Sequence, residues 1–283
     1  MNKSKISIPP LKIQGIKTKL VPFIEENVQI KKDTLWIEPF MGSGVVGFNL
    51  APEQAIFSDI NPHIINFYNG LKYHKITSTI VRDFLETEGN QLEKQEGYYY
   101  TVRDRFNNQH NPLDFLFLNR SCFNGIMRFN KKGQFNVPFC KKTTRFSKAY
   151  ITKIVNQVKF IENKLYYSDW QFLCSSFEQV LSYINNNNST FIYCDPPYIG
   201  RSVDYFDSWN ESNELKLCNL LKNSNSKFML STWDHNKYRE NIYIENFWDF
   251  CNKVTKEHFY HVGGKITNRN TISEALLVNY ELI

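Results

Sequence analysis

A carboxylate, two prolines and an aromatic ring follow one another at Asp195-Pro196-Pro197-Tyr198, directly after the apolar run at 191–194. The run is typical of a buried strand, so the carboxylate would lie at the strand's carboxyl end. Proline fixes its own φ and restricts the preceding residue, and the four residues therefore form a stiff corner. Such a corner can simply terminate a strand. It can also present the Asp195 carboxylate and the Pro196 carbonyl as two acceptors beside the flat Tyr198 ring, which suits the exocyclic amino group of a nucleic-acid base.

The loop "MGSG" at 41–44 lies between an expected strand at 34–40 and an expected short helix at 45–51. Its glycines, Gly42 and Gly44, let the backbone approach a ligand closely, and the N-terminus of the helix adds a positive dipole. No Gly-Lys-Ser/Thr follows, so the loop is not a P-loop. A Gly-x-Gly after a strand is alone weak evidence for a nucleotide site, since it is often only a turn.

A second acid, Asp59, ends the next expected strand at 55–59. An acid at this point, about one β-α-β unit after a glycine loop, can accept hydrogen bonds from a ribose. The same acid could instead cap the helix that follows, in which Asn61 is also a capping candidate and Pro62 takes the first position. Both roles stay open for Asp59 from the residues alone.

The alternation of strands and helices predicts an α/β fold with a Rossmann-like, mostly parallel sheet and an antiparallel C-terminal edge. Residues 1–71 and 155–283 form one discontinuous domain in this interpretation, and residues 72–154 form a mostly helical insert. Within the insert, residues 126–139 alternate around Lys-Lys-Gly and predict a β-hairpin. The last segment predicts two antiparallel strands around a basic loop.

The composition is that of an ordinary globular protein of 283 residues, with a net charge of +6 and 16% aromatic residues. A mild basic excess permits a polyanionic partner without requiring one. The six cysteines form no CxxC pair and have no histidine at zinc-ligand spacing, so we expect reduced thiols and no metal site. No apolar h-region and no apolar run of membrane-spanning length occur, and we expect a cytoplasmic protein without a membrane partner.

Six segments occur in the order found in Dam-type DNA adenine N6-methyltransferases, and the chain resembles that family over roughly residues 9–280. The segments are "KIQGIK" (12–17), "EPFMGSG" (38–44), "SDINPHIINFYNGL" (58–71), "RSCFNGIMRFNKKGQFNVPF" (120–139), "SDW" (168–170) and "DPPY" (195–198). The long hairpin segment and the ordered combination are specific, whereas each short motif alone is not. The first segment departs from the family pattern, because Ile13 replaces an aromatic residue and Ile16 replaces the second glycine.

The resemblance implies methyl transfer from S-adenosyl-L-methionine to N6 of a flipped-out adenine in double-stranded DNA, with S-adenosyl-L-homocysteine as product. The implied catalytic residues are Asp195, Pro196, Pro197 and Tyr198. The implied cofactor-binding residues are Ile13, Lys17, Phe40, Gly42, Ser43, Gly44, Asp59, Asp169, Trp170 and Asp195. The implied DNA-binding residues are Arg120, Asn124, Arg128, Asn130, Lys131, Lys132 and Asn136.

The same resemblance implies a site-specific enzyme of a restriction-modification system, with a cognate endonuclease, or an orphan methylase. We expect a monomer or weak dimer in a bacterial cytoplasm, or in the host cytoplasm if the gene is carried by a phage. Two alternatives remain: an N4-cytosine or RNA adenine methyltransferase with the same corner, and a catalytically silent DNA-binding module. The first would more often carry Ser or Asn in place of Asp195 and would lack the hairpin. The second would not need an intact cofactor loop.

Overall fold

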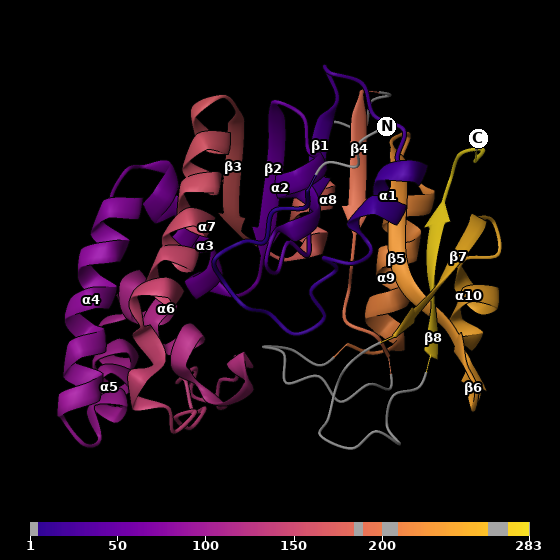
Figure 1. Ribbon diagram of the computed structural model, residues 1–283. Helices are drawn as coiled ribbons and strands as arrows, with labels where there is room; N and C mark the ends of the chain where they lie inside the picture. The colour runs from indigo at the N-terminus through magenta and orange to yellow at the C-terminus, as the bar shows by residue number, and fades with distance from the viewer. Residues whose placement is uncertain (1–4, 184–188, 200–208, 260–270, 283) are drawn as a thin grey trace.

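The computed structural model describes residues 5–183, 189–199, 209–259 and 271–282. An eight-stranded sheet lies at its centre (Figure 1). The strands run in the order β3-β2-β1-β4-β5-β8-β7, with the short β6 paired to β5. The strands are β1 Leu35–Glu38, β2 Gln54–Asp59, β3 Asp169–Cys174, β4 Thr190–Cys194, β5 Lys227–Asn236, β6 Arg239–Glu240, β7 Asn252–Phe259 and β8 Thr271–Val278. The five strands from β3 to β5 are parallel, whereas β8 and β7 are antiparallel, so the expected α/β class is confirmed.

Alternating side chains on the strands supply two separate apolar layers, because successive residues of a strand point to opposite faces. In β4, Phe191 and Tyr193 belong to one cluster of buried residues, while Ile192 and Cys194 belong to the other. Trp36 of β1 stacks on both rings of the first pair, with centroid distances of 5.4 and 5.8 Å. A continuous apolar run in a central strand is thus explained by burial on both faces.

Helices cover both faces of the sheet. The described helices are α1 Val21–Asn27, α2 Val45–Leu50, α3 Pro62–Lys72, α4 Ser78–Lys94, α5 Tyr98–Gln109, α6 Pro112–Ser121, α7 Lys148–Tyr166, α8 Phe177–Tyr183, α9 Glu211–Lys222 and α10 Ile242–Phe247, with short 3-10 turns at Phe123–Gly125 and Thr143–Phe146. Residues of α1, α2 and α3 share the cluster of Trp36, and residues of α8, α9 and α10 share the cluster of Ile192. None of the helices in the described ranges is long and apolar enough to cross a membrane.

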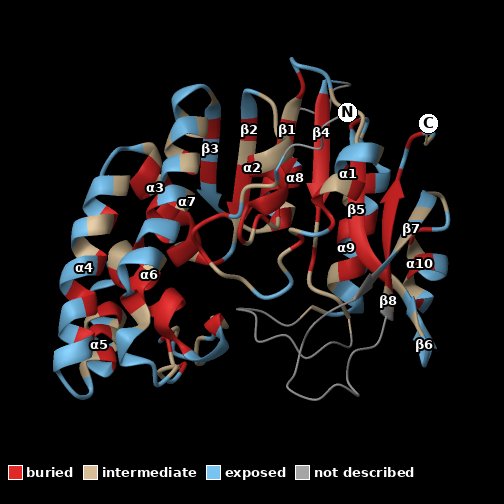
Figure 2. Cartoon of the chain, viewed as in Figure 1, coloured by how far each residue is buried: buried red, intermediate tan, exposed pale blue. Residues whose placement is uncertain are grey.

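The insert lies beside the β3 edge of the sheet, where α4, α5 and α6 gather in Figure 1. Buried segments alternate with exposed ones along the helices of the insert (Figure 2). Its buried residues, such as Leu85, Phe106 and Phe117, belong to the same cluster as the α3 side of the sheet. The apolar core therefore continues from the sheet into the insert. The division expected at residue 155 falls inside α7, which runs unbroken across it, and the two-unit organisation of the chain stays a prediction.

Residues 126–139 fold back on themselves, but they do not form the two regular strands of the expected hairpin. Only isolated antiparallel bridges join Phe129 to Phe135 and Cys122 to Phe139 among the described residues of this segment. Gly133, with a φ of 73°, and the hydrogen bond from its N–H to the Asn130 carbonyl make the turn. We call residues 126–139 the recognition loop.

Other sequence expectations correspond closely to the observed elements. Asn61 caps α3, because its side chain accepts a hydrogen bond from the N–H of His63 and Pro62 takes the first helical position. The two antiparallel C-terminal strands are present as β7 and β8. The basic loop expected between them, 260–270, lies outside the described residues. The segment 164–170 does not form one element of the α/β pattern, because its first residues end α7 and β3 begins only at Asp169.

Candidate active site

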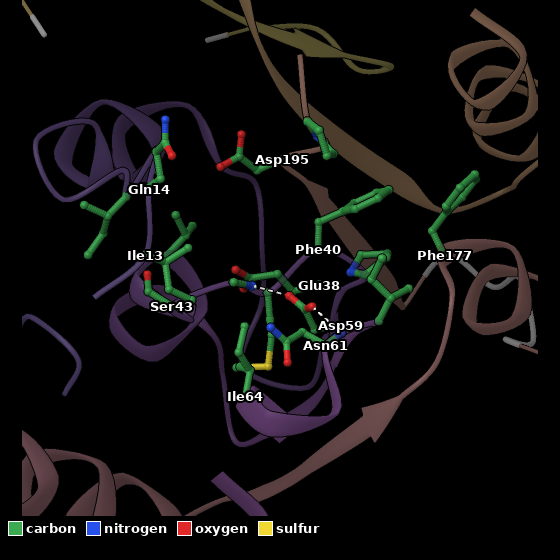
Figure 3. Close-up of a pocket in the computed structure, with 18 of the residues that line it drawn as sticks. Ile13, Gln14, Glu38, Phe40, Ser43, Asp59, Asn61, Ile64, Phe177 and Asp195 are labelled. Atoms are coloured by element: carbon green, nitrogen blue, oxygen red, sulfur yellow. Dashed lines mark hydrogen bonds between the residues drawn. The ribbon is translucent and has the colours of Figure 1, made fainter. Parts of the chain in front are cut away.

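A pocket opens at the carboxyl ends of β1 and β4, the two central strands whose following chain segments diverge. In open α/β sheets such a point is where ligands bind. Side chains from residues 13–17, 38–46, 59–64 and 176–178 line the pocket together with Asp195 and Pro197. Figure 3 shows Ile13 and Ser43 on one wall and Phe40 and Phe177 on the opposite one. The sheet thus brings together segments that are far apart in the sequence.

The glycine loop lies against this pocket in a conformation that needs its glycines. Gly42 and Gly44 have φ values of 47° and 72°, in the left-handed region that side chains with a Cβ rarely adopt. A Cβ on Gly44 would also lie 2.4 Å from the Phe48 ring. Ile13 packs over the loop, with its Cγ2 3.8 Å from where a Cβ of Gly42 would be. The backbone here can therefore come close to a ligand, as expected from the sequence.

Asp59 fixes the glycine loop to the start of α3. One carboxylate oxygen accepts a hydrogen bond from the Gly42 N–H at 3.0 Å, and the other accepts from the Asn61 N–H at 2.8 Å. Burial raises the pKa of Asp59 to about 6, and the two backbone hydrogen bonds oppose that rise. Asn61, not Asp59, is the helix cap, so the capping alternative for Asp59 is wrong.

Glu38, at the end of β1, is a buried acid of the pocket that the sequence reasoning did not select. Its Oε2 accepts a hydrogen bond from the Trp36 indole N–H at 3.0 Å. Burial raises the pKa of Glu38 to about 8, and the nearby Asp195 adds to the rise. A carboxyl group with this pKa is largely protonated at neutral pH, so it can donate a hydrogen bond. The sequence did contain a signal for Glu38, because it lies in the "EPF" segment directly before the glycine loop.

The corner after β4 is tied to two distant segments of the chain. The Lys17 ammonium lies 3.2 Å from Asp195 Oδ1 and donates a hydrogen bond to the Tyr198 hydroxyl at 2.6 Å. The Tyr198 hydroxyl in turn donates to Glu274 Oε2 at 2.8 Å. Burial raises the pKa of Asp195 to about 6; Lys17 opposes the rise and Glu274 adds to it. Pro197 also lines the pocket, so the corner lies at its rim.

Three aromatic rings form the far wall of the pocket. Phe40 stacks on Phe177 at 5.4 Å and meets Trp209 edge-on at 5.4 Å. The buried Glu214 carboxylate holds Trp209 by accepting a hydrogen bond from its indole N–H at 2.6 Å, and it also accepts from Trp248 at 2.8 Å. Flat apolar surfaces of this kind suit a purine ring. Only Phe40 of this group was selected from the sequence.

Asp169 and Trp170, expected near the cofactor, lie at the amino end of β3, whereas the pocket lies at the carboxyl ends of the strands. Asp169 begins β3 and pairs in register with Gln54, the first residue of β2, whereas Asp59 pairs with Cys174 at the other end. Trp170 is buried in the apolar core and donates its indole N–H to the Pro52 carbonyl. The assignment of both residues to the cofactor is wrong, because the motif lies at the start of β3 and not after its carboxyl end.

The segment that follows β3, and not Asp169 or Trp170 at its start, reaches the pocket. Ser176 and Phe177 come directly after the carboxyl end of the strand and line the pocket. A small polar pair before an aromatic residue, "SSF" at 175–177, was the available signal. Correct strand bounds for β3 would have been needed to select it over "SDW".

The recognition loop touches the same pocket from the insert. Met127 and Phe129 are among the lining residues. Phe129 stacks on the buried His63 of α3 at 5.0 Å and meets Phe135 edge-on at 5.5 Å. The recognition loop therefore packs against the start of α3 through the contact between the Phe129 and His63 rings.

Polar side chains of the recognition loop lie at the surface. Arg128 is exposed and donates from Nε to the Asn136 side-chain oxygen at 3.0 Å. The Asn130 side-chain oxygen accepts from the N–H groups of Lys132 and Gln134, so Asn130 builds the turn itself. The Lys132 side chain is exposed, as are those of Lys131 and Asn124.

Arg120, expected to bind DNA, is instead a core residue. Only 3% of it is exposed, and its guanidinium donates hydrogen bonds to the Tyr150 hydroxyl and the Gln157 side-chain oxygen. Its carbonyl also accepts a hydrogen bond from Arg145. The DNA-binding assignment of Arg120 is wrong, because α6 turns this side chain toward α7 and away from the surface.

Comparison with known proteins identifies the family. The family model for D12 class N6 adenine-specific DNA methyltransferases matches residues 14–262. The chain is 30% identical to the type II methyltransferase M.MjaIII of Methanocaldococcus jannaschii, over 96% of this chain and 99% of that protein. It is 30% identical to the type II methyltransferase M.FokI of Planomicrobium okeanokoites, over 96% of this chain and 42% of that protein.

A third relative is the DNA adenine methylase of Haemophilus influenzae, which is 34% identical over 67% of this chain and 63% of its own length. These matches favour adenine N6 as the target over cytosine N4 or RNA adenine, and an enzyme over a silent binding module. The pocket at the end of β1, the glycine loop and the corner after β4 all lie within the matched residues. The chain therefore belongs to the family of D12 class N6 adenine-specific DNA methyltransferases.

Proposed function

We propose that S-adenosyl-L-methionine, the methyl donor of this enzyme, lies along the glycine loop with its reactive methyl group beside Asp195. The observation that carries this proposal is one continuous pocket that joins Asp59 and the Phe177 wall to Asp195. The adenine of the cofactor would lie against Phe40 and Phe177. The ribose hydroxyls would donate hydrogen bonds to Asp59, and the methionine end would lie along residues 42–44 toward Lys17.

The target adenine enters from the side of the corner after β4. It must first leave the duplex, which costs a few kcal/mol. Tyr198 stacks on the flipped base, while the Asp195 carboxylate and the Pro196 carbonyl accept the two N6 hydrogens. Because the N6 lone pair is delocalised into the ring, these two acceptors favour the nucleophilic form of nitrogen and offset its developing positive charge.

Positioning supplies much of the remaining rate enhancement. The corner is rigid, since two prolines fix its backbone, and the Phe129 contact fixes the recognition loop relative to the cofactor pocket. Nitrogen held in line with the sulfonium methyl group reacts without a costly search for the correct geometry. The sulfonium C–S bond would break as the bond from N6 to the methyl carbon forms, S-adenosyl-L-homocysteine would be the leaving group, and the Asp195 carboxylate would take the proton lost from N6.

DNA contacts divide between two kinds of side chain in the recognition loop. Lys131 and Lys132 hold phosphates, because an ammonium on a flexible stem acts as a point charge without base selectivity. Arg128, fixed by Asn136, reads a base edge, and Asn124 contributes beside it. Asn130 supports this surface by shaping the turn.

The relatives support a restriction-modification role, since two of them carry the name type II methyltransferase. We infer a cognate endonuclease that cuts the same DNA site, a monomer or weak dimer, and a bacterial cytoplasmic location. An orphan methylase is the alternative. Challenge of methylated cellular DNA with nuclease extracts from the source cells distinguishes the two, because only a cognate endonuclease would be blocked by the methyl mark.

The cofactor placement is tested by titrating S-adenosyl-L-methionine by calorimetry into the wild-type protein and the Phe177→Ala variant. Loss of a stacked aromatic wall should weaken binding about tenfold, in line with the 0.5–1.5 kcal/mol of aromatic pairs plus lost burial. Leu173→Ala is the control, since that exposed side chain of β3 does not line the pocket. Equal affinity of Phe177→Ala and wild type contradicts the placement.

A further inference from the structure

Glu274 is a buried carboxylate in the middle of the largely apolar strand β8. It pairs with Trp233 across β5 and β8, beyond the last paired residue of β4. Its neighbours on the same face of β8, Leu276 and Val278, belong to the core cluster, and Glu274 itself is only 1% exposed. Burying a carboxylate is unfavourable unless hydrogen bonds or opposite charges compensate for the lost hydration, so the partners of Glu274 indicate why it is there.

These contacts lead directly to the corner after β4. Glu274 Oε2 accepts the hydrogen bond of the Tyr198 hydroxyl at 2.8 Å and lies 3.8 Å from the Lys17 ammonium. The ammonium is closer to Asp195, at 3.2 Å, and is itself only 5% exposed. Lys17 thus lies between two carboxylates and is nearer to the one that would receive the target amino group.

This arrangement sets a problem for base entry. An amino group that donates to Asp195 competes with Lys17 for the same oxygen. The displaced ammonium would keep the Tyr198 hydroxyl as an acceptor but would lose its nearest carboxylate, which is unfavourable for a buried charge, so a second carboxylate acceptor nearby would favour the displacement. Glu274 offers that second acceptor, because a shift of about 1 Å would bring Lys17 from 3.8 Å to ordinary hydrogen-bond distance.

We propose that Glu274 is a positioning residue of methyl transfer, which holds the Tyr198 hydroxyl and receives Lys17 when the target amino group displaces the ammonium from Asp195. The inference rests on the proposed role of Asp195 as acceptor of the N6 hydrogen. Glu274 lies on the antiparallel strand β8, outside both the glycine loop and the corner after β4.

The direct test is Glu274→Gln, which keeps the shape of the side chain and an oxygen for Tyr198 but removes the negative charge that Lys17 needs. We expect kcat at saturating DNA and cofactor to fall about tenfold or more, since hydrogen bonds to charged groups contribute about 1.5–3 kcal/mol. The cofactor Kd and the KM for DNA should change less than twofold, because neither requires the amino group to reach Asp195.

A pH profile provides a second readout that a merely structural role would not move. Lys17, Glu274, Glu38, Tyr193 and the Tyr198 hydroxyl surround or electrostatically face Asp195. Removing the charge of Glu274 lowers the pKa of Asp195, because that charge contributes to its rise. The acid limb of kcat should therefore move to lower pH in Glu274→Gln.

A double-mutant cycle with Tyr198→Phe separates this role from general destabilisation. The two changes should be non-additive in kcat, because both interrupt one network. If Glu274→Gln does not fold, Tyr198→Phe alone cuts the same hydrogen bond without altering β8, and wild-type kcat in it would overturn the proposal. Glu257→Gln, the same change at an exposed position of the adjacent strand β7, is the matched control and should behave as wild type.

Asp195→Asn separates this inference from the proposed function. An active Asp195→Asn enzyme means that the role of Asp195 is wrong, and the inference then fails with it. An inactive Asp195→Asn enzyme together with wild-type kcat and an unchanged acid limb in Glu274→Gln overturns only the role of Glu274.

Discussion

The corner after β4 and the recognition loop are both polar surfaces near the same pocket, yet they are held in opposite ways. Asp195, Lys17 and Tyr198 are tied by charged hydrogen bonds to a buried carboxylate on another strand. Arg128 is exposed and donates a hydrogen bond to the half-buried Asn136. Under the proposed function, the charges that would perform chemistry are thus fixed before substrate arrives, whereas those that would contact DNA remain at the surface.

This difference has an energetic reason. A preorganised group of low exposure acts strongly on a developing charge, because little water screens it and no reorganisation is needed. A charged group that contacts DNA must be accessible to it, and an exposed charge keeps its hydration in the free protein. Substitutions in the two regions should therefore differ in size and in kind.

The largest effect should come from Asp195→Ala. Loss of the carboxylate acceptor removes stabilisation of the charge that develops on N6, and kcat should fall about a hundredfold to a thousandfold, as for the loss of one oxyanion-hole donor. Transfer of a radiolabelled methyl group to DNA measures the loss, and circular dichroism checks the fold. Asp169→Ala is the control, because Asp169 lies at the amino end of β3, away from the pocket, and this variant should retain activity. Comparable losses in both variants contradict this assignment.

Asp59→Ala should weaken cofactor binding about tenfold to a hundredfold, since charge-assisted hydrogen bonds contribute about 1.5–3 kcal/mol each. DNA affinity should remain near the wild-type value, because the Asp59 carboxylate is bonded to the glycine loop and to the start of α3 and not to the exposed basic side chains of the recognition loop. Calorimetric titration with each ligand separately measures both. A loss of thermal stability with unchanged cofactor affinity would mean that Asp59 only holds the glycine loop to α3.

The pH dependence of kcat should follow Asp195. Its pKa is raised to about 6, mainly by burial, and the ionised form is the one that accepts the N6 hydrogen. Activity is therefore present above pH 6 and lost as pH falls, by about tenfold for each further unit. Saturating S-adenosyl-L-methionine removes the separate effect of Asp59, whose pKa is also about 6, on cofactor binding. A flat profile between pH 5 and 7 would argue against this acceptor.

Arg120→Ala should act on stability instead of DNA binding. It leaves the half-buried Tyr150 hydroxyl and Gln157 side chain with fewer partners, which costs about 1–3 kcal/mol of unfolding free energy. Denaturant titration measures this loss. The salt dependence of DNA affinity should stay unchanged, and a reduced salt slope in a stably folded variant would restore Arg120 to the DNA surface.

The smallest effect should come from Lys132→Ala. Loss of one phosphate contact weakens binding to all duplexes alike and reduces the slope of log K against log salt by about one unit. Binding to specific and random duplexes over a salt series measures this change. Lys94→Ala, at the end of α4, provides an exposed lysine away from the recognition loop for comparison. A loss confined to one DNA sequence would assign Lys132 to base reading.

The sequence allowed much of the sheet and of the site to be predicted, because strand ends carry local signals. Gly42 and Gly44 adopt the backbone that glycine permits, and Asp59 and Asp195 end strands that neighbour β1. These residues meet at one edge because parallel strands share their direction.

What could not be predicted depended on burial and register. Arg120 has the residue type of a DNA contact, but the direction in which α6 turns it is a tertiary property. Asp169 was misplaced because a shift of a few residues in the bounds of β3 moves it to the other edge of the sheet. Glu274 is acidic within an apolar strand, yet only the packing of β8 near Tyr198 gives that pattern a meaning.

The most direct test of the division between the two regions is methylation sequencing of one DNA substrate treated with wild type, Asp195→Ala and Arg128→Ala. Wild type should place N6-methyladenine at a defined site. Asp195→Ala should leave no mark, whereas Arg128→Ala should keep the same mark but spread it over related sites, since a lost base contact costs about 1–3 kcal/mol of discrimination. Methylation by Asp195→Ala, or unchanged site selection by a folded Arg128→Ala enzyme, would contradict the account.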